Sequence, residues 1–372
     1  MTDVEQLVRE ALRRHEAEVP VPDPLEARPV VRRARRRQVL NAVGVGMVAA
    51  LLAVVAVTGI GALLRADAPR PAIEPTPGPF VKARGWIAFR DGQDIVAVDP
   101  ANPTHTVVLG TSTGAEPIAW SLDGTQLLLR SGISINRWSY PLTLSILRAD
   151  GSRTVLLNDD GSGGSPPFAT WGSFSPDGSE VAYACCGSSR GPFVIDATGG
   201  EPRALGDRCE RDKIDGQPVE LCGEPLAEAA AWSPDGSRIA WIDFVEDSET
   251  YGHHAVVLSF VNPDGTGLRE EVAQLPGGGH SLVWSPDGSR LAFWAADADD
   301  RNAQIYVIEA DGSNLQQLTH DGENLWPTWS PDGTRIAFVR NGVLHTLAPD
   351  GTDLQEVEGV RPDGPITWNP VV

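Results

Sequence analysis

Positive charge is scarce in this 372-residue chain, which has 30 Lys and Arg residues against 50 Asp and Glu residues and a net charge of −20. Only Lys82 and Lys213 are lysines, and this preference for Arg, with abundant Ala, Gly, Val and Pro, is typical of a high-GC bacterial genome. Residues 1–38 hold nine Arg and seven acidic residues and residues 39–64 hold no charge, so residues 65–372 carry −22. A surface this negative repels nucleic acid, which we exclude as a partner.

Signatures of catalysis and of cofactor binding are also missing. The sequence has no Gly-rich nucleotide loop. One Gly-x-Ser-x-Gly pattern occurs at 110–114, but it lies between two repeats and lacks the strand, turn and helix that make such a serine reactive. The histidines and cysteines show none of the usual metal-ligand spacings. We therefore expect a protein that is not an enzyme, with no catalytic residue, no cofactor and no metal.

One short phrase is repeated five times along the chain. In each copy an aromatic residue ends an apolar run, an Asp-Gly pair supplies the positive φ of a tight turn, and a second apolar run follows. Each copy is therefore expected to form a β-hairpin. The copies are Trp120-Ser-Leu-Asp-Gly, Phe174-Ser-Pro-Asp-Gly, Trp232-Ser-Pro-Asp-Gly, Trp284-Ser-Pro-Asp-Gly and Trp329-Ser-Pro-Asp-Gly.

The spacing of the turns predicts a β-propeller. A second turn signal follows each copy, at Asp150, Gly199, Asp264, Asp311 and Asp350, so each repeat has the four strands of a blade. Residues 85–99 resemble a sixth blade without its first strand, and residues 365–369 supply that strand, with Trp368 in the aromatic position. We expect an all-β, six-bladed propeller that the C-terminal strand closes, which removes free sheet edges.

Two phrases make the pattern more specific. Trp-Ser-Pro-Asp-Gly-x-x-Ile-Ala-Phe at 329–338 and Ile-Tyr-Val-x-x-x-Asp-Gly at 305–312 resemble those of TolB-like, WD-repeat-like propellers. The resemblance covers residues 84–369, and the chain departs from it with Leu122 in place of Pro and Phe174 in place of Trp. It implies a six-bladed fold and a tendency to bind other proteins, although this fold serves many functions.

Residues 39–64 carry no charged side chain and are mainly Val, Ala, Leu, Ile and Gly, long enough as a helix to cross a bilayer. We expect one transmembrane helix; the alternative is a cleaved signal peptide with a site at Ala66-Asp67-Ala68. Five Arg residues between positions 32 and 37 precede this helix, which predicts a cytoplasmic N terminus. The chain then divides into a cytoplasmic segment 1–38, the inner-membrane helix 39–64, a Pro-rich linker 65–83 and an extracytoplasmic propeller 84–372.

The cytoplasmic segment contains one helix signal. Thr2 and Glu5 fit a capping box, and apolar residues fall on one face as far as about Glu18. The helix could dock a cytoplasmic regulator, or it could simply lie on the membrane surface, since a helix this short is marginal alone.

A binding site is expected on one face of the propeller. In a four-stranded blade the Asp-Gly turns share one face, called here the Asp-Gly face, and the connections between strands two and three and between blades lie on the other, the loop-rich face. Variable loops on a rigid ring commonly carry function. The candidates there are the aromatic residues Trp138, Tyr140 and Tyr251, as partner anchors, and the histidines His253, His254, His280 and His320. A cation held by these histidines and nearby aspartates is the alternative.

The four cysteines are also expected on the loop-rich face. Cys185 and Cys186 start one loop, and Cys209 and Cys222 lie in the next. In an oxidising exterior an even number so placed favours two disulfides, for which three pairings remain open. A zinc site is the alternative, but it lacks the usual short ligand spacing.

Together these patterns predict a membrane-anchored, non-enzymatic binding or scaffold module of the bacterial cell envelope. Its partner is expected to be an envelope protein, or a small ligand or glycan, at the loop-rich face. Two alternatives are an envelope hydrolase or lyase acting on glycan or peptide at that face, and a sensor that signals through the cytoplasmic helix.

Overall fold

The structure, a computed structural model, describes residues 78–132, 134–135, 138–139, 143–157, 168–186, 191–205, 210–214, 217–221, 229–246, 254–277, 279–296 and 302–371. All belong to one compact unit, Thr76–Val372. The cytoplasmic segment 1–38, the helix 39–64 and most of the linker 65–83 lie outside the described residues and stay predictions. Within the described ranges, no helix is both long and apolar enough to span a membrane.

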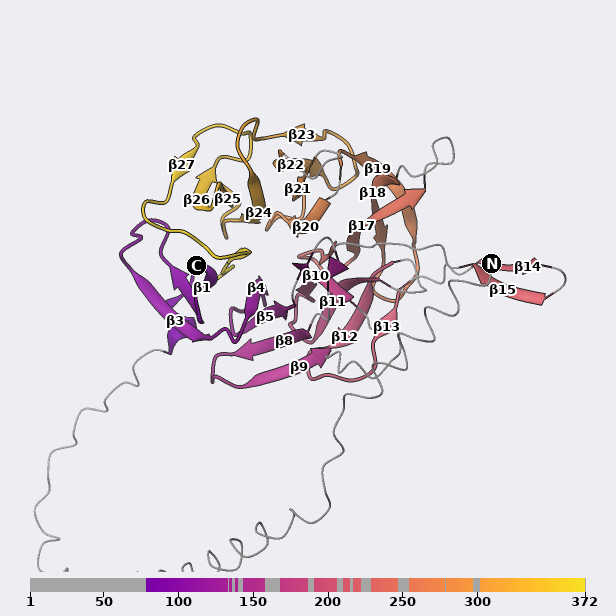
Figure 1. Cartoon of the computed structure of the whole chain (residues 1–372), viewed down its shortest axis with the longest axis horizontal. Coiled ribbons are helices and arrows are strands. Elements are labelled where there is room, and N and C mark those ends of the chain that lie inside the picture. Colours follow the sequence, from indigo (N-terminus) through magenta and orange to yellow (C-terminus); the bar gives the residue numbers. More distant parts are fainter. Residues whose placement is uncertain are drawn as a thin grey trace, which may run out of the picture. The chain divides into compact units, whose positions relative to one another are not determined.

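Six four-stranded antiparallel sheets surround a central axis, as predicted (Figure 1). The strands of each blade follow one another in chain order, except that the last strand, β28, takes the first place in blade 1. Blade 1 contains β28 (Ile366–Trp368), β1 (Ile87–Asp91), β2 (Asp94–Val98) and β3 (Thr106–Thr111). Blade 2 contains β4 (Ala115–Trp120), β5 (Gln126–Ser131), β8 (Thr143–Arg148) and β9 (Arg153–Leu157). Blade 3 contains β10 (Phe168–Phe174), β11 (Glu180–Cys186), β12 (Phe193–Asp196) and β13 (Arg203–Ala204).

The second half of the ring repeats this plan. Blade 4 contains β16 (Ala229–Trp232), β17 (Ile239–Glu246), β18 (His254–Val261) and β19 (Arg269–Leu275). Blade 5 contains β20 (Gly279–Trp284), β21 (Arg290–Ala295), β22 (Gln304–Glu309) and β23 (Gln316–Gln317). Blade 6 contains β24 (Asn324–Trp329), β25 (Ile336–Arg340), β26 (Val343–Leu347) and β27 (Gln355–Glu356). Two small hairpins are inserted, β6 (Ser134–Ile135) with β7 (Trp138–Ser139) and β14 (Glu210–Ile214) with β15 (Gln217–Leu221).

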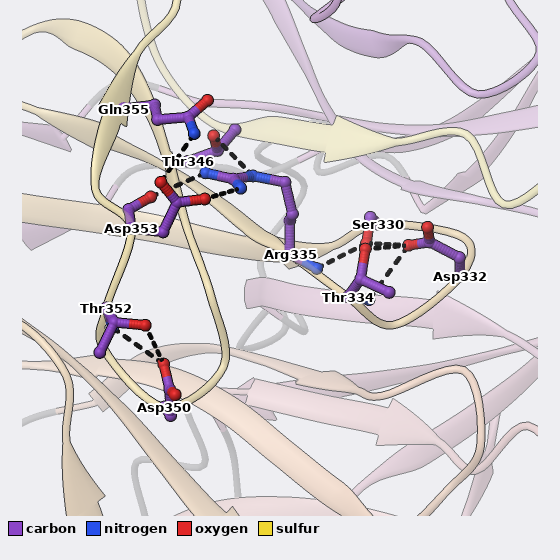
Figure 2. A network of polar contacts seen from close by, with 9 residues as sticks. All are labelled: Ser330, Asp332, Thr334, Arg335, Thr346, Asp350, Thr352, Asp353 and Gln355. Atoms are coloured by element: carbon purple, nitrogen blue, oxygen red, sulfur yellow. Dashed lines mark hydrogen bonds and ion pairs between the residues drawn. The ribbon is translucent and has the colours of Figure 1, made fainter.

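In blades 2 to 6, the turn after the first strand is held by its own aspartate. In blade 6, Ser330 Oγ donates to Asp332 Oδ1 at 2.6 Å, and the backbone N and Oγ of Thr334 donate to the same oxygen at 3.0 and 2.8 Å (Figure 2). The other four turns repeat these bonds, and the five glycines have φ between 68° and 74°, a region that favours glycine. Hydrogen bonds led by those of Ser175 and Ser233 lower the pKa of Asp177 and Asp235 to about 2.

The ring closes as the sequence predicts. Strand β28 pairs with β1, with Trp368 opposite Ile87, and Trp368 Nε1 donates to the Gly85 carbonyl at 2.7 Å. Within the predicted linker, a short helix α3 (Pro79–Lys82) precedes β1. Its Phe80 is 2% exposed, and its ring lies 5.1 Å from that of Trp120, edge to face. Burial of Phe80 between blades 1 and 2 anchors this end of the linker to the ring.

The seams between blades are filled by the repeated aromatic residues. Trp120, Phe174, Trp232, Trp284, Trp329 and Trp368 are all buried. Where blade 4 meets blade 5, the guanidinium carbon of Arg238 lies 5.0 Å from the ring centres of both Phe260 and Trp284. Its Nη1 also donates to the Ala310 carbonyl at 3.1 Å. At the next seam the guanidinium carbon of Arg290 lies 5.0 Å from the ring centre of Trp329, so cations over aromatic faces tie these blades together.

Candidate functional site

The described strands fix which connections share the loop-rich face. In blades 2 to 6 the first strand ends at an Asp-Gly turn, so the other end of that strand, and every connection that reaches it, lies on the opposite face. This face includes the β6–β7 hairpin in blade 2, the β14–β15 hairpin after blade 3, and the ends of β17 and β18, where Glu246 pairs with His254. By contrast, blades 1 and 6 join their second and third strands by tight turns after Asp91 and Arg340.

The structure places four of the predicted site residues on this face by their position in the fold. Trp138 begins β7 opposite Ile135, His254 begins β18, and His280 is the second residue of β20. His320 lies in the β23–β24 connection and its side chain is exposed. Tyr140, Tyr251 and His253 lie outside the described residues. A binding role for these seven residues stays a prediction.

The cysteines are described only in part. Cys185 and Cys186 end β11, where they pair with Ala169 and Phe168 of β10, at the loop-rich end of blade 3. Cys209 and Cys222 lie outside the described residues, so both predicted disulfides stay predictions. Among the described residues, no group of His, Cys, Asp and Glu side chains could hold a metal ion.

A polar network fixes the part of the loop-rich face that carries His320. Asn324, the first residue of β24, is fully buried, and its Nδ2 donates to the Asp321 carbonyl at 2.9 Å and to Gln304 Oε1 at 3.1 Å. The carboxylate of Asp321 forms a 2.6 Å ion pair with Arg340. These bonds tie the connection at 318–324 to blades 5 and 6, beside the tight turn of blade 6.

A second charged cluster lies on the loop-rich face where blades 1, 2 and 3 meet. Glu116 of β4 accepts a bond from Arg130 Nε at 3.3 Å and lies 3.6 Å from Arg90 Nη2. The guanidinium carbon of Arg130 lies 5.2 Å from the ring centre of Trp171. Burial lowers the pKa of Arg130, and the charge of Glu116 opposes this shift. Sequence reasoning missed these residues, since an Arg at the end of a second strand looks like any surface charge until the blades are assembled.

Comparison with known proteins supports the fold. The family described as the TolB beta propeller domain matches residues 215–343. The structure is similar to that of TolB from Acinetobacter baumannii, at 14% identity and TM-score 0.52 over 76% of this chain and 66% of that one. It is also similar to a putative TolB from Agrobacterium tumefaciens, at 17% identity and TM-score 0.51 over 74% of this chain and 89% of that one.

A third similar structure comes from a nidogen/laminin complex, at 14% identity and TM-score 0.53 over 76% of this chain and 98% of that one. No curated protein matches the chain in sequence. Because all three identities are low, these likenesses establish a shared fold.

Proposed function

We propose that this chain, which carries a TolB β-propeller domain, is a non-enzymatic protein-binding module of the bacterial cell envelope. One helix at residues 39–64 holds it at the inner membrane, with the N terminus in the cytoplasm and the propeller on the other side. An envelope protein docks on the loop-rich face. The similar propeller from a nidogen/laminin complex supports protein binding as a use of this fold.

The observation that carries the proposal is the position of the two ends of the propeller. Helix α3 leads into β1 at Ile87, and β28 leaves the ring at Trp368, which pairs with Ile87. After Trp368 the chain passes the Asp-Gly turn of blade 2, since Val371 lies 2.9 Å from where a Cβ on Gly124 would stand. Both ends therefore lie on the Asp-Gly face. The described chain therefore enters and leaves the ring on the face opposite to the one where we propose that the partner docks.

Capture of the partner tests the docking face. The full-length protein is cross-linked in its native cells and purified, beside a variant in which an Asn-Gly turn replaces residues 247–253. Leu315→Ala is the matched control, because Leu315 is an exposed residue of an outer turn on the Asp-Gly face. We expect one envelope protein to come with the wild type and the control but not with the loop variant. Equal capture by all three would reject the 247–253 loop as the docking site, and capture of no protein would reject protein binding in favour of a small ligand, a glycan or catalysis.

A topology measurement tests the anchor separately. Alkaline phosphatase, which is active only outside the cytoplasm, is fused after Val371, with and without residues 39–64. We expect activity in a membrane fraction that resists alkaline extraction, and loss of membrane retention when residues 39–64 are deleted. Activity only in the soluble fraction of the intact fusion would support the cleaved signal peptide instead.

A further inference from the structure

The insertion between blades 3 and 4 contains a β-hairpin that belongs to no blade. Its strands, β14 (Glu210–Ile214) and β15 (Gln217–Leu221), form a two-stranded sheet of their own. Among the elements that the structure describes, these two strands pack chiefly on each other. A two-stranded hairpin by itself is only marginally stable in water. A covalent link at its open end would therefore stabilise it.

The register of the hairpin leads to two cysteines at this open end. Glu210 and Leu221 are the last pair of the ladder, farthest from the turn. Cys209 directly precedes Glu210 in the sequence, and Cys222 directly follows Leu221. One further step of the same register sets Cys209 opposite Cys222. Opposite residues of an antiparallel pair have Cα atoms about 4.5 or 5.5 Å apart, which falls within the range of about 4.4–6.8 Å that disulfides usually span.

The other two cysteines belong to a different ladder. Cys185 and Cys186 end β11, where they pair with Ala169 and Phe168 of β10. As neighbours in the chain, they have Cα atoms about 3.8 Å apart across a trans peptide, which is less than a disulfide usually spans. A bond between them would distort the strand that these pairs hold, so the two cysteines are poor partners for each other.

A bond between the two groups of cysteines would have to order more of the chain. A link between Cys209 and Cys222 encloses 12 residues, whereas a link between Cys186 and Cys209 encloses 22. The entropic cost of closing a loop grows slowly with its length, so length alone does not decide the pairing. The register does, because the hairpin already brings one pair together. A link to β11 joins two separate sheets and must also fix the segment between them.

We infer that Cys209 and Cys222 form a disulfide across the open end of the β14–β15 hairpin, and that Cys185 and Cys186 stay thiols. As the S–S bond forms, the two thiols lose two protons and two electrons, and a disulfide of an exchange partner accepts them and becomes two thiols. The choice of pair depends on the register alone. Formation of the bond in the cell rests on the proposed extracytoplasmic location of the propeller, because the cytoplasm keeps thiols reduced.

Peptide mapping of the full-length protein identifies the bond. Protein from its native cells is denatured in N-ethylmaleimide, which blocks every thiol, and is then digested with trypsin. Cleavage after Arg and Lys places the cysteines on three peptides, with Cys185 and Cys186 on 154–190, Cys209 on 209–211 and Cys222 on 214–238. We expect 209–211 to be linked to 214–238, and 154–190 to carry two blocked thiols. A link from 154–190 to either other peptide, or a bond within 154–190, would overturn the inference.

A second sample separates the choice of pair from the location of the propeller. The purified full-length protein is reduced, reoxidised in a glutathione buffer and mapped in the same way. If this sample contained the expected link while the sample from cells contained four blocked thiols, the pairing would be supported and the extracytoplasmic location would be wrong. Four blocked thiols in both samples would overturn the pairing.

Two matched variants test whether the bond stabilises the hairpin. Cys209→Ser removes the bond, and we expect trypsin to cleave the native protein after Arg211 or Lys213 about tenfold faster than wild type, since a hairpin without its link opens more often. Cys185→Ser is the control, because it also removes one cysteine but keeps the bond, and it should be cleaved like wild type. Melting temperatures verify that both variants fold. Equal cleavage of all three proteins would reject a stabilising role for the bond.

Discussion

The two faces of the propeller differ in how closely their connections repeat from blade to blade. On the Asp-Gly face, five turns repeat the same three bonds to one aspartate, and the bond from the turn serine is 2.6 to 2.7 Å long in all five. On the loop-rich face, the connection between the second and third strands is a tight turn in blades 1 and 6, but it contains a hairpin in blade 2. The turns of the Asp-Gly face thus stabilise the ring, while the connections of the loop-rich face can differ in length without disturbing it.

The largest expected effect comes from breaking the repeated framework. Trp284→Ala removes a buried ring that stacks on Arg238 and donates to the Ala231 carbonyl at 3.0 Å. We expect the free energy of unfolding to fall by about 3–5 kcal/mol, as for other buried aromatic residues. Chemical denaturation of the full-length protein measures this change. Replacement of residues 247–253 by Asn-Gly should cost less than about 1 kcal/mol, and an equal loss in both variants would erase the difference between the faces.

A smaller effect should follow from removing one cation from its seam. Arg238→Ala loses the stacking on Phe260 and Trp284 and the bond to Ala310. The expected loss is about 1–2 kcal/mol, the sum of a partly desolvated cation–π contact and one hydrogen bond. Arg238→Lys keeps the charge but not the planar group and should recover only part of the loss. Full recovery by Lys would mean that charge alone, and not stacking, holds the seam.

The turn aspartates give the Asp-Gly face a dependence on acid. The pKa of Asp177 is 3.8 in an unperturbed chain and about 2 in the folded protein, because of the bonds led by Ser175. A lowered folded pKa means that its stabilising effect is complete above about pH 4 and is lost as the pH falls through about 2. Melting curves of wild type and Asp177→Asn should therefore differ at about pH 5 and converge toward pH 2. If the two melting temperatures differed by the same amount at every pH in this range, the charge of the Asp177 carboxylate would not contribute to stability.

The smallest expected effect is an increase in the free energy of unfolding. Blade 2 has Leu122 where the other four turns have Pro, and Leu122 is 45% exposed. Leu122→Pro should raise the free energy of unfolding by about 0.4–1 kcal/mol, because Pro restricts the unfolded chain. Thermal melting of the variant measures the gain, with Leu354→Pro, in an outer turn without this Pro pattern, as the comparison. A loss at Leu122 would mean that this turn differs from its four relatives.

Most of the ring could be predicted from the sequence because its signals are local. Asp-Gly turns, the aromatic residues before them and the strand runs after them all lie within a few positions of each other, and Trp368 could be matched to the same phrase. Helix α3 and the β6–β7 and β14–β15 hairpins were not predicted. Phe80 is buried only because Trp120 meets it across a seam, and no local pattern records that contact.

The candidate sites were harder to predict because they depend on contacts between residues that lie far apart in the sequence. The clusters around Glu116 and Asn324 join residues from different strands or blades. The histidines and aromatic residues chosen from the sequence could be assigned to a face by topology, but topology does not say which side chains meet.

The pairing of β28 with β1 sets an order for folding. Ile87 and Trp368 stand at opposite ends of the propeller sequence, so the ring stays open until its last strand is available, however early the individual blades form from local hairpins. Closing so long a loop is slow and carries an entropic cost. Until then β1 presents an unpaired edge, which is a hazard for aggregation while the chain is being synthesised and folded. The protein therefore depends on a late docking step, and conditions that delay β28 should harm its yield more than its final stability.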